Sequence, residues 1–282
     1  MKQKKEIAMI LPYFGKFPWY FPFFLQSCRY NPNVDFFIIS DHQYDSPLPE
    51  NVIVIRQSFA DLTKWIGSKL GFEVNIPYPY KLCDFKPTYG LVFSELIRGY
   101  KFWGHGDIDV IYGKITDFIT DKVLNTHDII SIRHDYLTGY FLLYRNNCKM
   151  NLLFKQSKDY KKVFTCAQHF CFDETNFTWS LFNSGVTYDK IYCEIESMTH
   201  VVYKMKKLKS VKPYFDFHVI SGRGNIRWEK GVLWFSEEGK EYEILLYHLI
   251  DFKHVYHPKG LPKIIPEMFF FDQDRIYYSQ VK

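Results

Sequence analysis

The first third of the chain alternates apolar segments of strand character with amphipathic segments of helical character. Because strands that alternate with helices favour crossover connections, this order predicts an open α/β sheet in which neighbouring strands run parallel. Ser58 is a typical N-cap residue and marks the start of one of the helices. We expect strands over residues 6–11, 34–40, 51–56 and 100–103, and helices over residues 18–30, 58–70 and 87–100.

An acidic pair, Asp107 and Asp109, follows the fourth expected strand. Side chains two residues apart on a strand point to the same face, so both carboxylates can reach one point beyond the sheet. Ligands of open α/β sheets bind at that edge, beyond the carboxyl ends of the strands. Mg²⁺ or Mn²⁺, held together with substrate phosphates, suits such a pair. Gly104 and Gly106 would let a bulky ligand approach the backbone. A solvated turn is the alternative for so short a motif.

The remainder of the chain is expected to be less regular. Strands are expected over residues 129–133 and 140–144, a helix over 146–157, and antiparallel structure over 211–248. The sequence contains no internal repeat, low-complexity stretch or long linker. We therefore expect a single α/β domain over residues 1–282, with a mixed, mainly parallel central sheet flanked by helices and a less regular C-terminal part.

The composition argues against a nucleic-acid-binding or membrane-spanning protein. The net charge is only +5, no segment has the pattern of a nucleic-acid module, and no apolar segment is long enough to span a bilayer. The six cysteines form no Cys-x-x-Cys motif, so free thiols in the cytoplasm are the simplest expectation. The basic run over residues 204–212 could contact the cytoplasmic face of the inner membrane, with a solvated helix face as the alternative.

Strand–helix alternation followed by Asp-x-Asp resembles the GT-A glycosyltransferases. Residues 80–90 (Tyr-Lys-Leu-Cys-Asp-Phe-Lys-Pro-Thr-Tyr-Gly) and 102–113 (Phe-Trp-Gly-His-Gly-Asp-Ile-Asp-Val-Ile-Tyr-Gly) resemble a DUF6625-like group of bacterial glycosyltransferase-like proteins associated with capsule and O-antigen genes. Residues 139–146 and 172–174 resemble later blocks of that group. The likeness covers roughly residues 6–180 and implies a GT-A-like, Rossmann-like domain. A nucleotide-sugar-binding half would cover residues 1–125, an acceptor-binding half 126–260, and a C-terminal tail 261–282.

The resemblance also implies the residues of a donor site. Asp107 and Asp109 would hold Mn²⁺ or Mg²⁺ on the diphosphate of a nucleotide-sugar, with UDP as the first candidate nucleotide. A C-terminal His248 would complete the metal site and Lys253 would bind the diphosphate, although His254 and His257 are alternative ligands. The residues expected to bind the nucleotide-sugar are Pro12, Tyr13, Phe14, Asp41, Lys81, Asp84, Lys86, Asp107 and Lys253. For the lysines, an ordinary solvated surface charge is the alternative.

Sugar transfer with inversion also needs a general base near the acceptor hydroxyl. Asp173 and Glu174 are the candidates, with Asp173 preferred, and an acidic pair at a helix N-terminus is the alternative. Trp103, Tyr140 and Trp179 could stack on a sugar face, with core packing as the alternative.

The expected function is therefore that of a metal-dependent hexosyltransferase. It would move a sugar from a nucleotide-sugar to a glycan or lipid-linked saccharide acceptor in capsule, O-antigen or lipooligosaccharide synthesis, with inversion as the first expectation. Two alternatives remain open, namely a metal-dependent phosphohydrolase or nucleotidyltransferase and a non-catalytic carbohydrate-binding protein of the same fold. Neither the donor sugar nor the acceptor follows from the sequence.

Overall fold

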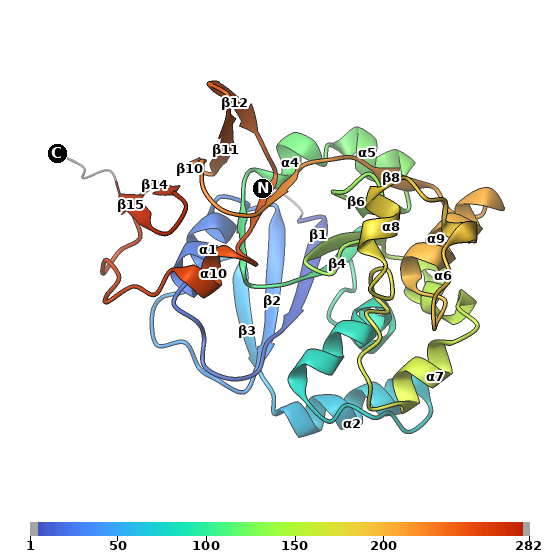
Figure 1. Ribbon diagram of the computed structural model, residues 1–282. Coiled ribbons are helices and arrows are strands. Elements are labelled where there is room, and N and C mark those ends of the chain that lie inside the picture. The colour runs from blue at the N-terminus through green and yellow to red at the C-terminus, as the bar shows by residue number, and fades with distance from the viewer. Residues whose placement is uncertain (1–4, 279–282) are drawn as a thin grey trace.

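A seven-stranded sheet forms the centre of the computed structural model, which describes residues 5–278 (Figure 1). Its strands, in spatial order, are β3 (Val52–Arg56), β2 (Val34–Ser40), β1 (Ile7–Pro12), β4 (Phe102–Gly106), β7 (Phe141–Arg145), β6 (Ile129–Ser131) and β8 (Pro213–Phe215). The pairs β2–β3, β1–β2, β1–β4 and β6–β8 are parallel, whereas β7 is antiparallel to both β4 and β6. The predicted mixed, mainly parallel sheet is confirmed.

Strand β1 is buried on both faces, which explains its uninterrupted apolar sequence. Ala8 and Ile10 belong to one apolar core, which also contains residues of α2 and Trp103. Met9 and Leu11 point to the opposite face and belong to a second core, which contains residues of α1. Helices therefore cover both faces of the sheet, as the prediction required.

The helices are short, and several are single turns. Helix α2 begins at the predicted cap, where Ser58 Oγ accepts a hydrogen bond from the Asp61 backbone N–H, and it ends at Gly71 in a left-handed conformation. The helices are α1 (Phe21–Arg29), α2 (Phe59–Leu70), α3 (Tyr89–Val92), α4 (Ile115–Phe118), α5 (Asp121–Thr126), α6 (Cys148–Asn151), α7 (Tyr160–Thr165), α8 (Trp179–Asn183), α9 (Met198–Lys207) and α10 (Phe252–Val255), with 3₁₀ segments η1 (Pro79–Thr88), η2 (Leu153–Gln156) and η3 (Tyr188–Lys190).

Two expected helices differ from the structure. The helix expected over residues 87–100 is replaced by η1 and the single turn α3, and the helix expected over 146–157 is divided into α6 and η2. Beyond α3 the first segment continues as turns, in which the Ser94 N–H donates to the Leu91 carbonyl and the Arg98 N–H donates to the Glu95 carbonyl. At the end of this segment, Asn146 Nδ2 donates to the carbonyls of Ile97 and Tyr100.

Two smaller sheets form most of the C-terminal part. The first has the order β5 (Val110–Tyr112), β13 (Leu246–His248) and β9 (Val219–Ser221), and the second has the order β12 (Lys240–Glu243), β11 (Val232–Glu237), β10 (Ile226–Glu229), β14 (Met268–Phe271) and β15 (Ile276–Tyr278). The segment expected as a tail, residues 261–282, thus contributes β14 and β15. Phe269 of β14 lies 5.1 Å, between ring centroids, from Phe23 of α1, and Figure 1 shows these red strands beside α1.

Gly104 serves a different purpose from the one expected, whereas Gly106 lines the pocket described below. A Cβ atom on Gly104 would lie 2.5 Å from Leu143 Cδ2 and one on Gly106 would lie 2.8 Å from the Tyr140 carbonyl oxygen. These glycines therefore allow β7 to pack closely against β4, and for Gly104 the space is filled by protein and not by a ligand. No helix within the described residues is both long and apolar enough to cross a membrane.

Candidate functional site

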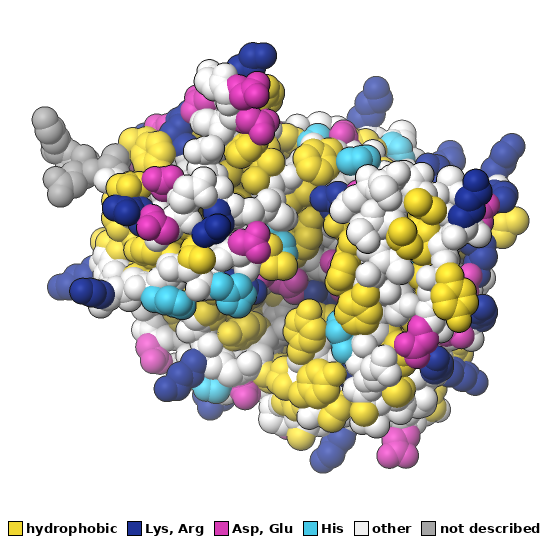
Figure 2. All heavy atoms as spheres, viewed as in Figure 1, with side chains coloured by type: hydrophobic (Ala, Val, Ile, Leu, Met, Phe, Trp, Pro, Cys, Tyr) yellow, Lys and Arg dark blue, Asp and Glu magenta, His cyan; other side chains and the backbone are white. Residues whose placement is uncertain are grey.

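A pocket of about 420 Å³ opens at the carboxyl ends of β1 and β4. This is the edge at which open α/β sheets bind ligands, and the volume is within the range of small-molecule sites. Figure 2 shows this face hollowed near its middle, where charged and histidine side chains lie among hydrophobic ones. The pocket brings together most of the residues predicted from the sequence, namely Pro12, Tyr13, Phe14, Lys86, Asp107, Asp109, Asp173, Glu174, His248 and Lys253.

Lys86 connects the acidic motif to the opposite wall of the pocket. Its Nζ lies 2.6 Å from Asp107 Oδ1, 3.0 Å from the Gly139 carbonyl oxygen and 3.9 Å from Asp173 Oδ2. Although burial opposes its charge, Asp107 and then other nearby acidic groups raise the pKa of Lys86 well above its ordinary value. Lys86 is therefore a buried, fixed positive charge at the base of the pocket.

Strand pairing brings the C-terminal part to Asp109. Strand β13 is antiparallel to β5 and places His248 opposite Val110, the residue that follows Asp109. His248 Nε2 lies 3.6 Å from Asp109 Oδ2, and Lys253 Nζ lies 2.6 Å from the same oxygen. Although burial opposes ionisation, His248 and Lys253 hold the pKa of Asp109 well below its usual range. Asp109 is thus a buried carboxylate with two basic neighbours.

The donor atoms at Asp109 and His248 are suitable for a divalent cation of the Mn²⁺ or Mg²⁺ kind. Within residues 5–278 no group of three His, Cys, Asp or Glu side chains is close enough to hold a metal ion. A site with one or two protein ligands normally completes its coordination with water and substrate phosphates. The residues present therefore fit a metal that binds together with a phosphorylated ligand. Of the alternative ligands, neither His254 nor His257 lines the pocket.

The structure distinguishes the two candidate bases. Glu174 is engaged at both oxygens, because Oε1 accepts from the Gly139 backbone N–H at 2.5 Å and Oε2 accepts from Trp179 Nε1 at 2.6 Å. Asp173 also lines the pocket, but within the described residues no backbone or indole N–H donates to its carboxylate. Lys86 Nζ lies 3.9 Å from its Oδ2. Burial, and then the neighbouring Glu174, raise the pKa of Asp173 well above its ordinary value, against the opposing effect of Lys86. Asp173 is therefore the carboxylate available to exchange a proton.

Gly139 allows the two carboxylates to approach the backbone. A Cβ atom at this position would lie 2.6 Å from Asp173 Oδ2 and 3.0 Å from Glu174 Oε1. Any larger residue would displace one or both carboxylates from the pocket wall. No sequence motif marked this glycine as a site residue, although it begins one of the segments that carry the family resemblance.

Three residues expected to bind the donor do not line the pocket. Lys81 is fully buried, and its Nζ donates to Asp84 Oδ2 at 2.8 Å and to the carbonyls of Val163 and Gln168. Asp84 also accepts from the backbone N–H groups of two residues, Phe170 and Phe172, so this ion pair anchors the loop that carries Asp173. Lys81 and Asp84 therefore have a structural role in place of the donor contact expected from the sequence.

Asp41 is the third expected donor-binding residue outside the pocket lining, and it stabilises the loop after β1. Its Oδ1 accepts a hydrogen bond from the Gly15 backbone N–H at 2.9 Å, at the end of the segment that lines the pocket. Trp103, a candidate for sugar stacking, is fully buried and donates to Asn151 Oδ1. Its role is core packing, whereas the other two candidates, Tyr140 and Trp179, line the pocket.

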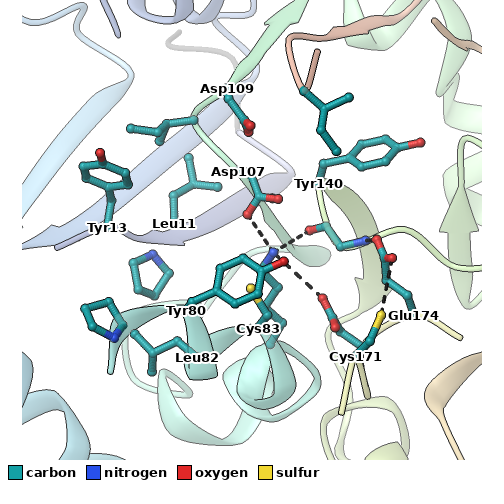
Figure 3. A pocket seen from close by; sticks show the side chains of 18 of the residues that line it. Leu11, Tyr13, Tyr80, Leu82, Cys83, Asp107, Asp109, Tyr140, Cys171 and Glu174 are labelled. Carbon is teal, nitrogen blue, oxygen red and sulfur yellow. Dashed lines mark hydrogen bonds and ion pairs between the residues drawn. The ribbon is translucent and has the colours of Figure 1, made fainter. Parts of the chain in front are cut away.

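Several pocket residues were not predicted as ligand-binding positions from the sequence. Tyr80, His169 and Phe177 line the mouth of the pocket, and Cys83 and Cys171 lie on its wall (Figure 3 labels Tyr80, Cys83 and Cys171). These residues belong to η1 and to the loop before α8, where no periodic pattern or short motif marks a ligand-binding position.

A family model described as "Family of unknown function (DUF6625)" matches residues 9–275. No curated protein matches the chain. Among solved structures, the chain is similar to the crystal structure of the galactosyltransferase LgtC in complex with donor and acceptor sugar analogues, at 11% identity and a TM-score of 0.31. That match covers 56% of this chain and 64% of the other. We draw no conclusion about activity from a similarity of this size.

Proposed function

We propose that this chain, which belongs to the DUF6625 family, is a glycosyltransferase that uses a divalent metal and a nucleotide-sugar donor. One observation carries the proposal: the pocket joins Lys86, Lys253, Asp107, Asp109 and His248, from distant parts of the chain, at the carboxyl edge of the parallel strands. This combination suits a ligand with a diphosphate, because lysines bind phosphate oxygens directly and carboxylates bind them through a metal.

The donor half of the pocket consists of Asp107, Asp109 and the residues paired with them. Asp109 and His248 would hold the metal, with Asp107 beside them, and the bound metal would neutralise charge on the nucleoside diphosphate as it leaves. Lys86 and Lys253 supply positive charge to the same diphosphate. Tyr13 and Phe14, which follow β1 and line the pocket, border the nucleoside, for which UDP is our first candidate.

The acceptor half contains Asp173. In the proposed reaction Asp173 accepts the proton of an acceptor hydroxyl, and the oxygen attacks the anomeric carbon of the donor sugar. The bond from that carbon to the diphosphate oxygen breaks, so the configuration inverts. Glu174 is a positioning residue, because its bonds to Gly139 and Trp179 fix the segment that carries Asp173.

The alternative enzyme class receives less support from the pocket. A two-metal phosphohydrolase or nucleotidyltransferase uses several clustered acidic or histidine ligands. In the described residues no three such side chains gather closely enough to hold an ion, which favours a transferase whose substrate completes the metal site. A carbohydrate-binding protein without activity would have no need of a buried pocket carboxylate whose pKa is raised above its ordinary value.

The acceptor that we propose is a bacterial surface glycan of the capsule, O-antigen or lipooligosaccharide kind, extended at the cytoplasmic face of the inner membrane. The basic residues Lys204, Lys206 and Lys207 lie in the last turn of α9. Such a cluster is attracted to anionic headgroups and supports peripheral contact with that membrane.

The test is release of nucleoside diphosphate from UDP-glucose, UDP-galactose and UDP-N-acetylglucosamine, with Mn²⁺ and with excess chelator. We expect one donor to be turned over by the wild-type protein, with or without added acceptor, and Asp173→Asn to bind that donor but release no UDP. Binding without turnover by the wild-type protein would favour the non-catalytic alternative. Absence of both binding and turnover for all three donors would contradict the choice of UDP.

A further inference from the structure

Four aromatic side chains form a continuous row along one wall of the pocket. Ring centroids are 4.9 Å apart between Tyr80 and His169, 5.5 Å between His169 and Phe177, and 5.6 Å between Phe177 and Trp179. All three contacts are edge-to-face, and all four residues line the pocket. Tyr80 is 67% exposed and Phe177 is 48% exposed, so much of both rings is open to solvent. The row therefore presents aromatic surface to whatever enters the pocket mouth.

Hydrogen bonds of Asn176 stabilise the loop that carries Phe177. Asn176 Nδ2 donates to the Phe170 carbonyl, and its Oδ1 accepts from the Glu194 backbone N–H, each at 2.9 Å. Phe177 itself has a φ of 63°, a left-handed conformation that is rare for a bulky residue. The exposed phenyl ring is thus on a fixed backbone, which limits the entropy lost when a ligand packs against it.

Polar groups lie directly beside the aromatic row. Trp179 Nε1 donates to Glu174 Oε2 at 2.6 Å, so the row ends at the segment that carries Asp173. His169 adds a ring with hydrogen-bonding nitrogens, and its Nδ1 lies 3.2 Å from Asp84 Oδ1. A pyranose ring has an apolar C–H face and a rim of hydroxyl groups, and so matches aromatic surface with carboxylates at its edge. An acyl chain would match the aromatic surface but leave the carboxylates facing an apolar ligand.

From this geometry we infer that Tyr80, His169, Phe177 and Trp179 form a saccharide platform that presents a hydroxyl group of its ligand to Asp173. Its role as the acceptor subsite rests on the proposed transferase function. The binding of a saccharide does not depend on that function. Tyr80 comes from η1 and the other three from the segment around α8, so the platform joins two parts of the chain that the fold brings together.

The experiment is saturation-transfer difference NMR with methyl β-glycosides of glucose, galactose and N-acetylglucosamine as probes. The test protein is the double variant Tyr80→Ala/Phe177→Ala, whose two side chains are exposed enough to be removed without opening the core. Phe177→Tyr keeps an aromatic ring at the same position. Tyr192→Ala is the matched control, because Tyr192 is 93% exposed and does not line the pocket.

At least one glycoside should bind the wild-type protein, Phe177→Tyr and Tyr192→Ala, and it should bind the double variant about tenfold more weakly, as loss of two ring contacts predicts. Equal binding by the double variant, or no binding of any probe to the wild-type protein, would overturn the inference. The same samples are titrated with UDP and Mn²⁺. If UDP binds but the substitutions leave glycoside binding unchanged, the platform is wrong and the donor site stands. If the substitutions abolish glycoside binding but UDP never binds, the platform stands and the proposed UDP donor site fails.

Discussion

The ammonium group of Lys253 lies 2.6 Å from Oδ2 of Asp109, a residue 144 positions earlier in the chain. The pair forms because β13 is aligned on β5, and Lys253 follows in α10. The backbone N–H of Leu249 also donates to the carbonyl oxygen of Asp109, at 2.9 Å. The acidic motif is therefore completed by the C-terminal part of the molecule, and changes there should affect the pocket directly.

Substitution of Lys253 by methionine should weaken both the fold and the donor site. The variant keeps the apolar stem of the side chain but leaves Asp109 buried with only His248 as a basic neighbour. We expect the free energy of unfolding to fall by about 2 kcal/mol and the affinity for UDP to fall about tenfold. Urea unfolding and calorimetric titration measure the two effects. Lys240→Met, on an exposed strand away from the pocket, is the matched control and should change neither. An unchanged affinity for UDP would exclude Lys253 from the donor site.

Asp173→Asn should remove activity and stabilise the protein. A carboxyl group whose pKa is raised on folding adds stability at pH values below its unfolded pKa of about 3.9 and loses that contribution as the pH rises towards the folded pKa. Replacing it with a neutral amide should therefore raise the free energy of unfolding by about 1 kcal/mol at neutral pH and by much less at pH about 3. Thermal unfolding of both proteins at the two pH values tests this. A variant that is less stable at neutral pH would contradict the burial of an ionisable Asp173.

The raised pKa of Asp173 also predicts how turnover depends on pH. Asp173 acts as a base only when it is deprotonated, and its pKa is raised, so the rate should increase with pH through a midpoint well above that of an ordinary aspartate. A profile of kcat against pH measures this midpoint. A profile that is already flat at pH about 5 would argue against Asp173 as the base.

Gly139→Ala should impair turnover more than folding. The added methyl group would meet Asp173 Oδ2 at 2.6 Å and Glu174 Oε1 at 3.0 Å, so the carboxylates must move. A displacement of this kind at a reacting group costs about a hundredfold in kcat. Gly260→Ala is the control, because a Cβ there meets nothing within 4 Å. Equal activity of the two alanine variants would show that the position of these carboxylates does not control the reaction.

Lys81→Met should destabilise the fold without altering donor binding. Removing Lys81 leaves the buried Asp84 carboxylate without its cation, which typically costs about 3–5 kcal/mol. The KM for the donor, measured at a temperature where the variant remains folded, should be unchanged because Lys81 does not line the pocket. A donor KM that rises while stability is retained would restore the donor-binding role first expected for Lys81.

Local signals in the sequence were sufficient to predict the parallel half of the fold. The apolar segments of β1 and β2 are long, and Ser58 marks the start of α2. The segment over residues 87–100 was wrongly predicted as a continuous helix. After the single turn α3 it continues as turns, and its last carbonyls are bonded by Asn146, a residue distant in sequence. Helical periodicity does not report such long-range contacts.

The same contrast between local sequence signals and long-range contacts applies to the site. Asp107 and Asp109 stand at a strand end, and this position was visible in the sequence. The burial of Lys81 and the exposure of Tyr80, one residue away, depend on how η1 packs against the loop before α8, and a side chain of either kind can occupy a 3₁₀ segment. The pairing of Lys86 with Asp107 likewise follows from the fold and not from a motif.

The most direct test of the account is calorimetric titration of the wild-type protein and Asp109→Asn with UDP, with and without Mn²⁺. Asn keeps the size of the side chain but removes the negative charge that a metal requires. We predict that UDP binds the wild-type protein at least about tenfold more tightly when Mn²⁺ is present, and that this difference disappears in Asp109→Asn. UDP binding that is independent of Mn²⁺ in both proteins would contradict a metal-dependent donor site at Asp109.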